Sequence, residues 1–418
     1  MIRATRTQWV KFAVVLALYL IFLVWLRSWL GLVVVPFIFD AYITKKIPWT
    51  WWRESKNRHV VTVMGWVDAI VFALVAVYFV NLYFFQNYVI PSSSLEKSLL
   101  TGDYLFVSKM SYGPRVPQTP LHMPLAQHTL PFFNCKSYLE HPQWDYKRVK
   151  GLGDVQLNDI VVFNFPAGDT VATGVPNDDI YRLSYGAGKE LAKPVDLASM
   201  TPEQQRVVYD YYYQLGREYL KENPQNFGEI ISRPVDRREN YVKRCVGLPG
   251  QTLEIKDRII YLDGKANKEP DNVQYRYLVK TKRPIPDDLA HELGISKEDM
   301  MMYYTDASVY NMPLTEKAKA GLLARKDIVV SIENTPADDA GGLYPLNMYK
   351  NWTTDNYGPV WIPKKGETVK LTIENLPVYE RPIHVYEGNE LAVKDGKIYI
   401  NGKETDEYTF KMDYYWMM

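Results

Sequence analysis

Two long apolar stretches near the N-terminus constrain the fold most. Residues 12–26 read FAVVLALYLIFLVWL without a charge, and after Arg27 the stretch 28–39, SWLGLVVVPFIF, extends the apolar region. Residues 66–85, WVDAIVFALVAVYFVNLYFF, form a second region whose single charge is Asp68. About 20 apolar residues in a helix suffice to cross a bilayer, because each residue adds about 1.5 Å. Both regions therefore predict membrane-spanning helices rather than buried core helices, and the first is too long for a cleavable signal peptide.

The first apolar region has two possible forms. It is either one long tilted helix broken near Arg27 and Pro36, or a tight helical hairpin, which the basic N-terminus favours. The following loop, residues 40–63, is basic, and its cations are Lys45, Lys46, Arg53, Lys56 and Arg58. Because such loops stay on the cytoplasmic side of a membrane, we expect the second span to deliver everything after Gln86 to the extracytoplasmic side.

The chain is therefore expected to have three parts. These are an N-terminal membrane segment with a cytoplasmic loop (1–63), a transmembrane helix (64–88), and an extracytoplasmic β-rich body (89–418) with helical insertions at about 169–238 and 270–385. Alternating apolar patterns and turn residues predict the strands, and capping residues predict the helices. The predicted strands are 104–110, 160–165 and 241–247, with hairpins in 252–262 and 394–403; the predicted helices are 201–224, 286–300 and 314–326.

Composition and metal-ligand spacing exclude several functional classes. The chain has 49 Lys and Arg against 48 Asp and Glu, a net charge of +1, which gives no reason to expect a nucleic-acid partner. The two cysteines, Cys135 and Cys245, exclude a four-cysteine zinc site and leave one disulfide as an open option. Because His122, His128 and His141 are loosely spaced, no metal site and no cofactor are expected.

The segment IPSSSLEKSLLTGDYLFVSK, residues 90–109, offers serines as nucleophiles without an obvious histidine partner. A lysine can replace histidine as the base, but only if burial lowers its pKa from about 10.4. In the strand YVKRCVG, Lys243 shares a face with Tyr241 and Cys245, and no other charge lies on that face. We expect Lys243 to be the base; the alternative is a solvated lysine on an edge strand. Arg244 points the other way and needs a carboxylate or water.

Three segments in order resemble bacterial type I signal peptidases, which are membrane-bound Ser-Lys proteases. IPSSSLEKSLLTGDYLFVSKMSYG is similar to the family's nucleophile region, NDIVVFNFP to its central strand, and YVKRCVGLPGQTLEI to its lysine segment. The resemblance implies that Ser94 is the nucleophile and Lys243 the general base. It also implies that the Ser92 hydroxyl and the backbone N–H of Ser94 hold the oxyanion.

The resemblance further implies a fold and an activity. The expected fold is a mainly β, signal-peptidase-like catalytic body anchored by N-terminal transmembrane helices. The expected reaction is the removal of signal peptides from secretory preproteins, which are cut after small residues at the −1 and −3 positions. The expected location is the cytoplasmic (inner) membrane, with the catalytic body on the extracytoplasmic (periplasmic) side. The partners are then preproteins and the lipid bilayer, with no cofactor and no nucleic acid.

Departures from the family pattern leave alternatives open. Leu95 replaces the usual Met, and Glu96-Lys97-Ser98 replaces x-Pro-Thr, which makes Lys97 a rival base. Residues 414–418, YYWMM, resemble a strand that leads in this family into a Gly-Asp-Asn segment. We therefore expect either a C-terminally truncated fragment or a protein that has lost this closing segment, with little or no activity. The alternatives are an inactive membrane-anchored homologue that binds other proteins, or another Ser-Lys protease of the self-cleaving repressor type.

Overall fold

A computed structural model describes residues 4–418 of the chain apart from a few positions, which are 92, 96, 131–132, 134, 177, 302–303, 307 and 338–341. The fold divides into two compact units. Unit 1 comprises Met1–Val89, Tyr104–Val155 and Pro234–Arg238, whereas unit 2 comprises Ile90–Asp103, Gln156–Arg233 and Glu239–Met418. The domain boundaries proposed from the sequence stay a prediction.

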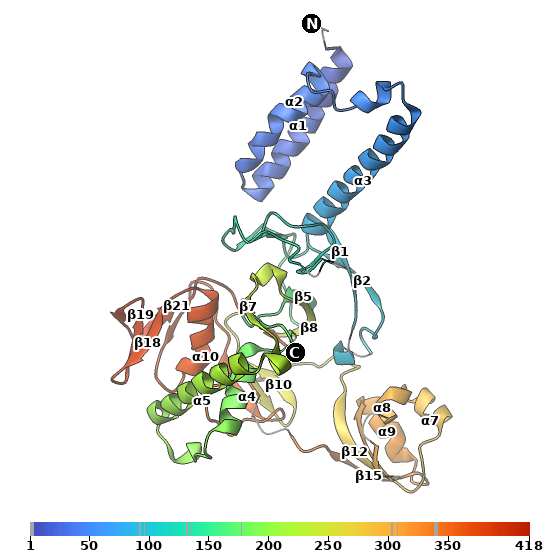
Figure 1. Ribbon diagram of the computed structural model, residues 1–418. Helices are drawn as coiled ribbons and strands as arrows, with labels where there is room; N and C mark the ends of the chain where they lie inside the picture. Colours follow the sequence, from blue (N-terminus) through green and yellow to red (C-terminus); the bar gives the residue numbers. More distant parts are fainter. Residues whose placement is uncertain are drawn as a thin grey trace. The chain divides into compact units, whose positions relative to one another are not determined.

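The first apolar region folds into a helical hairpin in unit 1. Helix α1 (Arg6–Leu26) begins at a capping box formed by Thr5 and Gln8, and it ends at Arg27, whose φ of 50° lies in the left-handed region. The chain then returns beside α1 (Figure 1) through η1 (Leu30–Val34), α2 (Val35–Phe39) and η2 (Asp40–Thr44). The hairpin, rather than one long helix, is therefore the form of this region.

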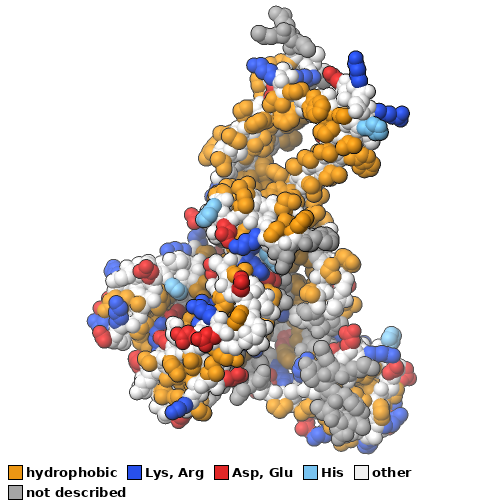
Figure 2. All heavy atoms as spheres, viewed as in Figure 1, with side chains coloured by type: hydrophobic (Ala, Val, Ile, Leu, Met, Phe, Trp, Pro, Cys, Tyr) orange, Lys and Arg blue, Asp and Glu red, His pale blue; other side chains and the backbone are white. Residues whose placement is uncertain are grey.

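The second apolar region forms one long helix. After η3 (Trp51–Glu54), helix α3 (Arg58–Tyr83) begins at Asn57, whose side chain accepts a hydrogen bond of 2.9 Å from the His59 N–H. Its 26 residues give a length of about 39 Å, enough to cross a bilayer. Figure 2 shows hydrophobic atoms along α1 and α3, and both helices have the length and composition of membrane spans.

Short strands and a small core cover the ends of α1 and α3. Leu26, Tyr83 and Val149 are buried together there, which ties both helix ends to the segment after them. Two antiparallel pairs complete this unit: β1 (Phe85–Val89) with β2 (Tyr104–Ser108), and β3 (Arg115–Val116) with β4 (Lys147–Arg148).

Unit 2 is built around two antiparallel sheets. One has the order β22-β8-β5, formed by β5 (Ile160–Asn164), β8 (Asn240–Gly247) and β22 (Trp416–Met417). The other has the order β11-β10-β9-β16, formed by β9 (Thr252–Lys256), β10 (Ile259–Leu262), β11 (Lys265–Ala266) and β16 (Tyr357–Trp361). The predicted hairpin in 252–262 is confirmed by β9 and β10.

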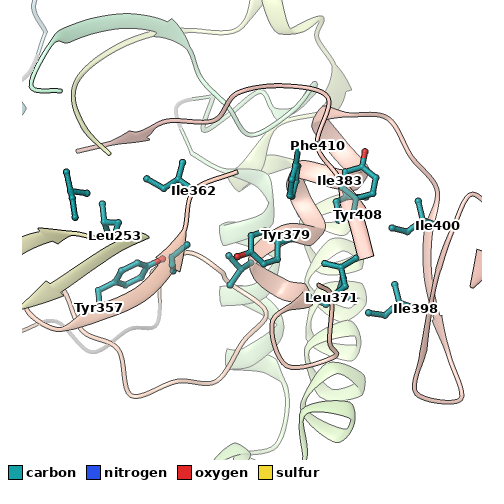
Figure 3. Packing of buried hydrophobic residues seen from close by; sticks show 14 of the residues in the cluster. Leu253, Tyr357, Ile362, Leu371, Tyr379, Ile383, Ile398, Ile400, Tyr408 and Phe410 are labelled. Carbon is teal, nitrogen blue, oxygen red and sulfur yellow. The ribbon is translucent and has the colours of Figure 1, made fainter. Parts of the chain in front are cut away.

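A second group of short strands packs into one hydrophobic core with these two sheets. The predicted hairpin in 394–403 is confirmed, and this group consists of β17 (Thr368–Lys370) with β21 (Glu407–Thr409), and β18 (Leu391–Lys394) with β19 (Lys397–Ile400) and β20 (Lys403–Glu404). A separate antiparallel pair is formed by β6 (Thr170–Ala172) and β7 (Ile230–Ser232). Helix α10 (Leu376–Arg381) and η7 (Pro382–Tyr386) supply further apolar side chains. Leu253, Ile362, Ile383 and Phe410 lie almost fully buried in this core (Figure 3).

The insertion after β11 has its own core, in which Val279, Met312 and Leu322 are buried. Its sheet has the order β13-β14-β12-β15, and its elements are β12 (Tyr275–Thr281), α7 (Asp287–Glu292), α8 (Lys297–Met301), β13 (Tyr304–Asp306), β14 (Val309–Leu314), α9 (Glu316–Ala324) and β15 (Val329–Asn334). The helix predicted at 286–300 is two helices, because Gly294 has a φ of 68° and ends α7.

The earlier insertion is a close pair of helices, α4 (Ile180–Leu191) and α5 (Pro202–Glu222), joined through η5 (Leu197–Ser199) and followed by α6 (Pro224–Phe227). As predicted, α5 begins at Thr201, which forms a capping box with Gln204. Glycine permits the close packing of the pair. A Cβ atom on Gly188 would lie 1.8 Å from the carbonyl oxygen of Tyr212, and one on Gly216 would lie 1.8 Å from that of Ser184.

Two glycine substitutions in α4 should have opposite effects on stability. Gly188→Ala should lower the free energy of unfolding by about 1–3 kcal/mol, because the new methyl group overlaps rigid backbone atoms of α5. Gly186→Ala, whose Cβ meets nothing within 4 Å, should raise it by about 0.5–1 kcal/mol through helix propensity. Denaturant unfolding of the full chain in detergent measures both, and equal effects would contradict the close packing.

Candidate active site

The serine segment folds as a closed loop whose ends are pinned together. The Ile90 N–H donates to the Asp103 carbonyl at 3.0 Å, and the Gly102 N–H donates to the Ile90 carbonyl at 2.9 Å. Gly102 has a φ of 91°, which the turn TGD requires and which only glycine adopts without strain. The loop between these ends is therefore fixed at its base by main-chain hydrogen bonds.

Within the loop, η4 (Ser93–Leu95) exposes Ser94 and buries Leu95. Leu95 is only 8% exposed, so it anchors the turn while the neighbouring hydroxyl stays accessible to a substrate. The carbonyl of Leu95 accepts hydrogen bonds from the N–H groups of Ser98 and Leu99 at 3.0 and 2.8 Å, which closes the turn. Ser92, the predicted oxyanion residue, lies outside the described residues.

Strand β8 carries the predicted base in the middle of its sheet. Lys243 is paired with Val161 of β5, and it is half-buried. Two residues after Lys243, Cys245 is fully buried. Two residues before it, Tyr241 stacks on Phe165 with ring centroids 4.8 Å apart. Lys243 therefore lies at the edge of the buried part of the strand. Burial lowers the pKa of this lysine below its ordinary value of 10.5.

The turn with Ser94 lies against the strand with Lys243. Residues of η4 and β8 approach within 8 Å, measured between Cα atoms. In the described part of the chain, no hydrogen bond joins the hydroxyl of Ser94 to the amine of Lys243. A nucleophile and its base need not share a hydrogen bond before the substrate binds, because catalytic hydrogen bonds often tighten only in the complex.

Arg244 links the two elements. Its guanidinium donates to the Ser98 hydroxyl at 2.9 Å and to the Asn158 carbonyl at 2.8 Å, neither of which is a carboxylate. Ser98 follows Ser94 in the same loop, so this contact holds the loop against β8. The residue types gave no signal for this pair, because 146 positions separate the two residues along the chain.

Strand β22 covers the other edge of β8. Trp416 and Met417 pair with Gly247 and Cys245, and Met418 exchanges two backbone hydrogen bonds of 2.9 Å with Arg244. Strand β8 is therefore held on both sides next to Lys243.

The remaining candidates from the sequence lie elsewhere. Lys97, the rival base, is half-buried in the serine loop with a φ of 70°. Cys135 is an exposed free thiol and Cys245 a buried one, so they form no disulfide. Among the described residues, no three His, Cys, Asp or Glu side chains gather into a metal site.

The contact between Arg244 and Ser98 can be tested by a double-mutant cycle. Arg244→Ala and Ser98→Ala should each lower the free energy of unfolding, and their effects should fail to add by about 1 kcal/mol, because both remove the same hydrogen bond. Ser331→Ala serves as the control, since its hydroxyl bonds Glu333 on another sheet. Additive losses from Arg244→Ala and Ser98→Ala would show that the contact is absent in solution.

Comparisons with known proteins identify the family of the chain. A family model described as "Signal peptidase, peptidase S26" matches residues 63–303, and no solved structure matches the chain. Signal peptidase I of Helicobacter pylori (strain ATCC 700392 / 26695) is 42% identical over 56 residues, which cover 13% of this chain and 18% of that protein. Signal peptidase I P of Bacillus subtilis subsp. natto is 20% identical over 279 residues, 66% of this chain and 90% of that protein.

A third relative is intermediate between these two in sequence identity and in the length matched. Signal peptidase I of Rickettsia prowazekii (strain Madrid E) is 24% identical over 165 residues, which cover 36% of this chain and 56% of that protein. The chain thus spans less than two thirds of the Helicobacter and Rickettsia proteins and most of the Bacillus protein. Because the family match includes Ser94, Lys243 and more than half of the 418 residues, the chain belongs to the signal peptidase family, peptidase S26.

Proposed function

We propose that this chain is a membrane-bound signal peptidase that removes signal peptides from secretory preproteins. The observation that supports this most is the placement of the Ser94 turn against β8 beside a lysine of lowered pKa. Family membership supports the same reaction, and two apolar helices supply candidate membrane anchors. The expected substrates carry small residues at the −1 and −3 positions next to a membrane-embedded signal helix.

In the proposed mechanism Lys243 acts as the general base. Its neutral amine accepts the proton of the Ser94 hydroxyl, Ser94 attacks the scissile carbonyl, and the lysine returns the proton to the leaving amine. Water activated by the same lysine then hydrolyses the acyl-enzyme. The backbone N–H of Ser94 and the Ser92 hydroxyl would stabilise the oxyanion; the role of Ser92 is carried by the resemblance alone. No cofactor takes part in these steps.

The proposed topology follows from charge. The loop between α2 and α3 is basic, and such loops remain in the cytoplasm. Helix α3 then carries the catalytic residues to the periplasmic side of the inner membrane, where signal peptides emerge from the bilayer.

The identity of the nucleophile can be tested with an acylating serine probe. The wild-type chain in detergent should be labelled, and Ser94→Ala should abolish both labelling and cleavage of a preprotein because it removes the attacking oxygen. Ser93→Ala, which changes the adjacent serine, should retain both activities. Ser92→Ala should slow cleavage about 10²- to 10³-fold without abolishing it. Labelling that survives Ser94→Ala would rule out this nucleophile, and an unlabelled wild type would favour an inactive homologue.

Lys243→Met should stabilise the protein while abolishing cleavage. Because burial lowers the pKa of Lys243 below 10.5, the folded chain carries a penalty when this amine is protonated. The penalty is complete below the folded-state pKa and disappears as the pH rises toward 10.5, so the gain in stability should be larger at pH 7 than at pH 10. Denaturant unfolding at several pH values measures this gain.

The exposed Lys256 provides the matched control. Lys256→Met should leave cleavage unchanged, and its effect on stability should not follow this dependence on pH. The wild-type cleavage rate should rise with pH up to an inflection below 10.5, which marks the deprotonation of Lys243. A rate that does not depend on Lys243, or a Lys243→Met chain that loses stability at pH 7, would remove the assigned base.

A further inference from the structure

Four basic side chains of unit 1 act on one another electrostatically. Arg115 and Arg148 are direct partners across the β3–β4 ladder. Their charges, and that of Arg237 in η6 (Val235–Arg237), act on the half-buried Lys109. We call these four residues the basic cluster. The carboxylate of Asp236 acts on Arg115 and Arg237, whereas the charges that act on Lys109 are all positive.

The carboxylate of Asp236 is already engaged by the backbone. Its Oδ2 atom accepts hydrogen bonds of 3.0 Å from the N–H groups of Gln118 and Thr119 and from the Thr119 hydroxyl. Arg237 is buried and donates to the same Thr119, through Nε to the hydroxyl at 2.6 Å and through Nη2 to the carbonyl at 3.1 Å. Asp236 and Arg237 therefore act mainly as structural residues that fix this loop.

The charges of Arg115, Arg148 and Arg237 all act against the protonated form of Lys109. Like charges directly opposite one another in an antiparallel pair are destabilising. Burial, followed by the charges of Arg115, Arg237 and Arg148, lowers the pKa of Lys109 to about 8. Burial also lowers the pKa of Arg115. An anion held among these cations would replace their mutual repulsion by attraction, and guanidinium groups suit phosphate oxygens in particular.

The cluster lies at the ends of the two candidate membrane spans. The Lys109 N–H donates at 2.8 Å to the carbonyl of Phe84, the residue that caps α3. Near Arg148, the amine of Lys147 donates at 2.9 Å to the carbonyl of Arg27, which caps α1. These bonds place the cluster at the depth of lipid headgroups if α1 and α3 cross a bilayer.

The surface around the cluster suits the same depth. Arg148 is exposed, with its Nη1 fixed to the Gly113 carbonyl at 2.7 Å and its Nε to the Tyr146 hydroxyl at 3.0 Å. The segment between β3 and β4 also exposes large apolar side chains, namely Leu121, Met123, Leu125, Leu139 and Trp144. Exposed apolar groups beside cations are typical of surfaces that lie in a membrane interface.

We propose that Lys109, Arg115 and Arg148 form a binding site for a phosphate group, supplied by the headgroup of an anionic phospholipid or by free phosphate. If the phosphate comes from a lipid, the proposal requires that α1 and α3 are the membrane spans. Whether the phosphate comes from lipid or from solution, the proposal does not depend on the chemistry of Ser94. A bound phosphate would join the ends of both helices to β3 and β4 through charge-assisted hydrogen bonds. The site would thus fix the depth of this part of unit 1 at the bilayer surface.

Native mass spectrometry of the full chain, released from bilayers of equal phosphatidylglycerol and phosphatidylcholine, tests the site. The wild type should retain phosphatidylglycerol at least tenfold more than phosphatidylcholine. The double variant Arg115→Gln/Arg148→Gln and the single variant Arg148→Gln should lower this ratio, the double variant to near one. Lys136→Gln is the matched control, because this cation lies in the same segment but forms an ion pair with Glu140.

A second arm distinguishes the source of the phosphate. In neutral detergent without lipid, inorganic phosphate should raise the Tm of the wild type above that in chloride of equal ionic strength, but not the Tm of the double variant. A phosphate effect without preferential lipid retention would assign the site to free phosphate. The proposal would be overturned if all variants retained lipid equally and phosphate had no specific effect on Tm. If the double variant fails to fold, the single variant Arg148→Gln still tests the site, because Arg148 is exposed. Retained cleavage of a soluble peptide by Arg148→Gln would separate this result from the proposed catalytic function.

Discussion

The alternation of side chains along β8 is the constraint on which the candidate site depends. A strand places consecutive residues on opposite faces, so Lys243 and Arg244 have to act in different directions. Arg244 reaches the loop that carries Ser94 through Ser98, while Lys243 remains on the face of Cys245. One short strand therefore carries the proposed base and also holds the loop of the proposed nucleophile. Pairing with β5 and β22 keeps this strand from shifting its register.

The depth of Lys243 follows from its position at the edge of the core. The strand is fully buried at Cys245 and half-buried at Lys243. Partial burial disfavours the ammonium form, but it leaves the amine accessible from the side where a substrate would lie. A fully buried lysine would have a still lower pKa, but a substrate could not reach its amine. The lowered pKa of Lys243 thus comes with a loss of stability, which is common for residues with a chemical task.

Two lysines with lowered pKa values illustrate how surroundings distinguish functions. For Lys243 the cause is burial alone, which suits a base that has to lose its proton. For Lys109 burial is joined by three neighbouring cations, which suits the attraction of an anion. The sequence presents both as lysines within or just after a strand. Only the surrounding charges separate a proposed catalytic group from a proposed phosphate ligand.

Local patterns in the sequence determined the apolar helices, the capping of α5, the two hairpins and the segments of Ser94 and Lys243, because those signals lie within a few neighbouring residues. Tertiary structure alone decided that the first apolar region turns back at Arg27, that Arg244 donates to Ser98, and that the charge of Arg237 acts on Lys109. These contacts join positions far apart in the chain, and their energies depend on burial and on neighbours that no short pattern records. The order of residues thus specified which groups are available for chemistry, whereas packing set which of them meet and in which state of charge.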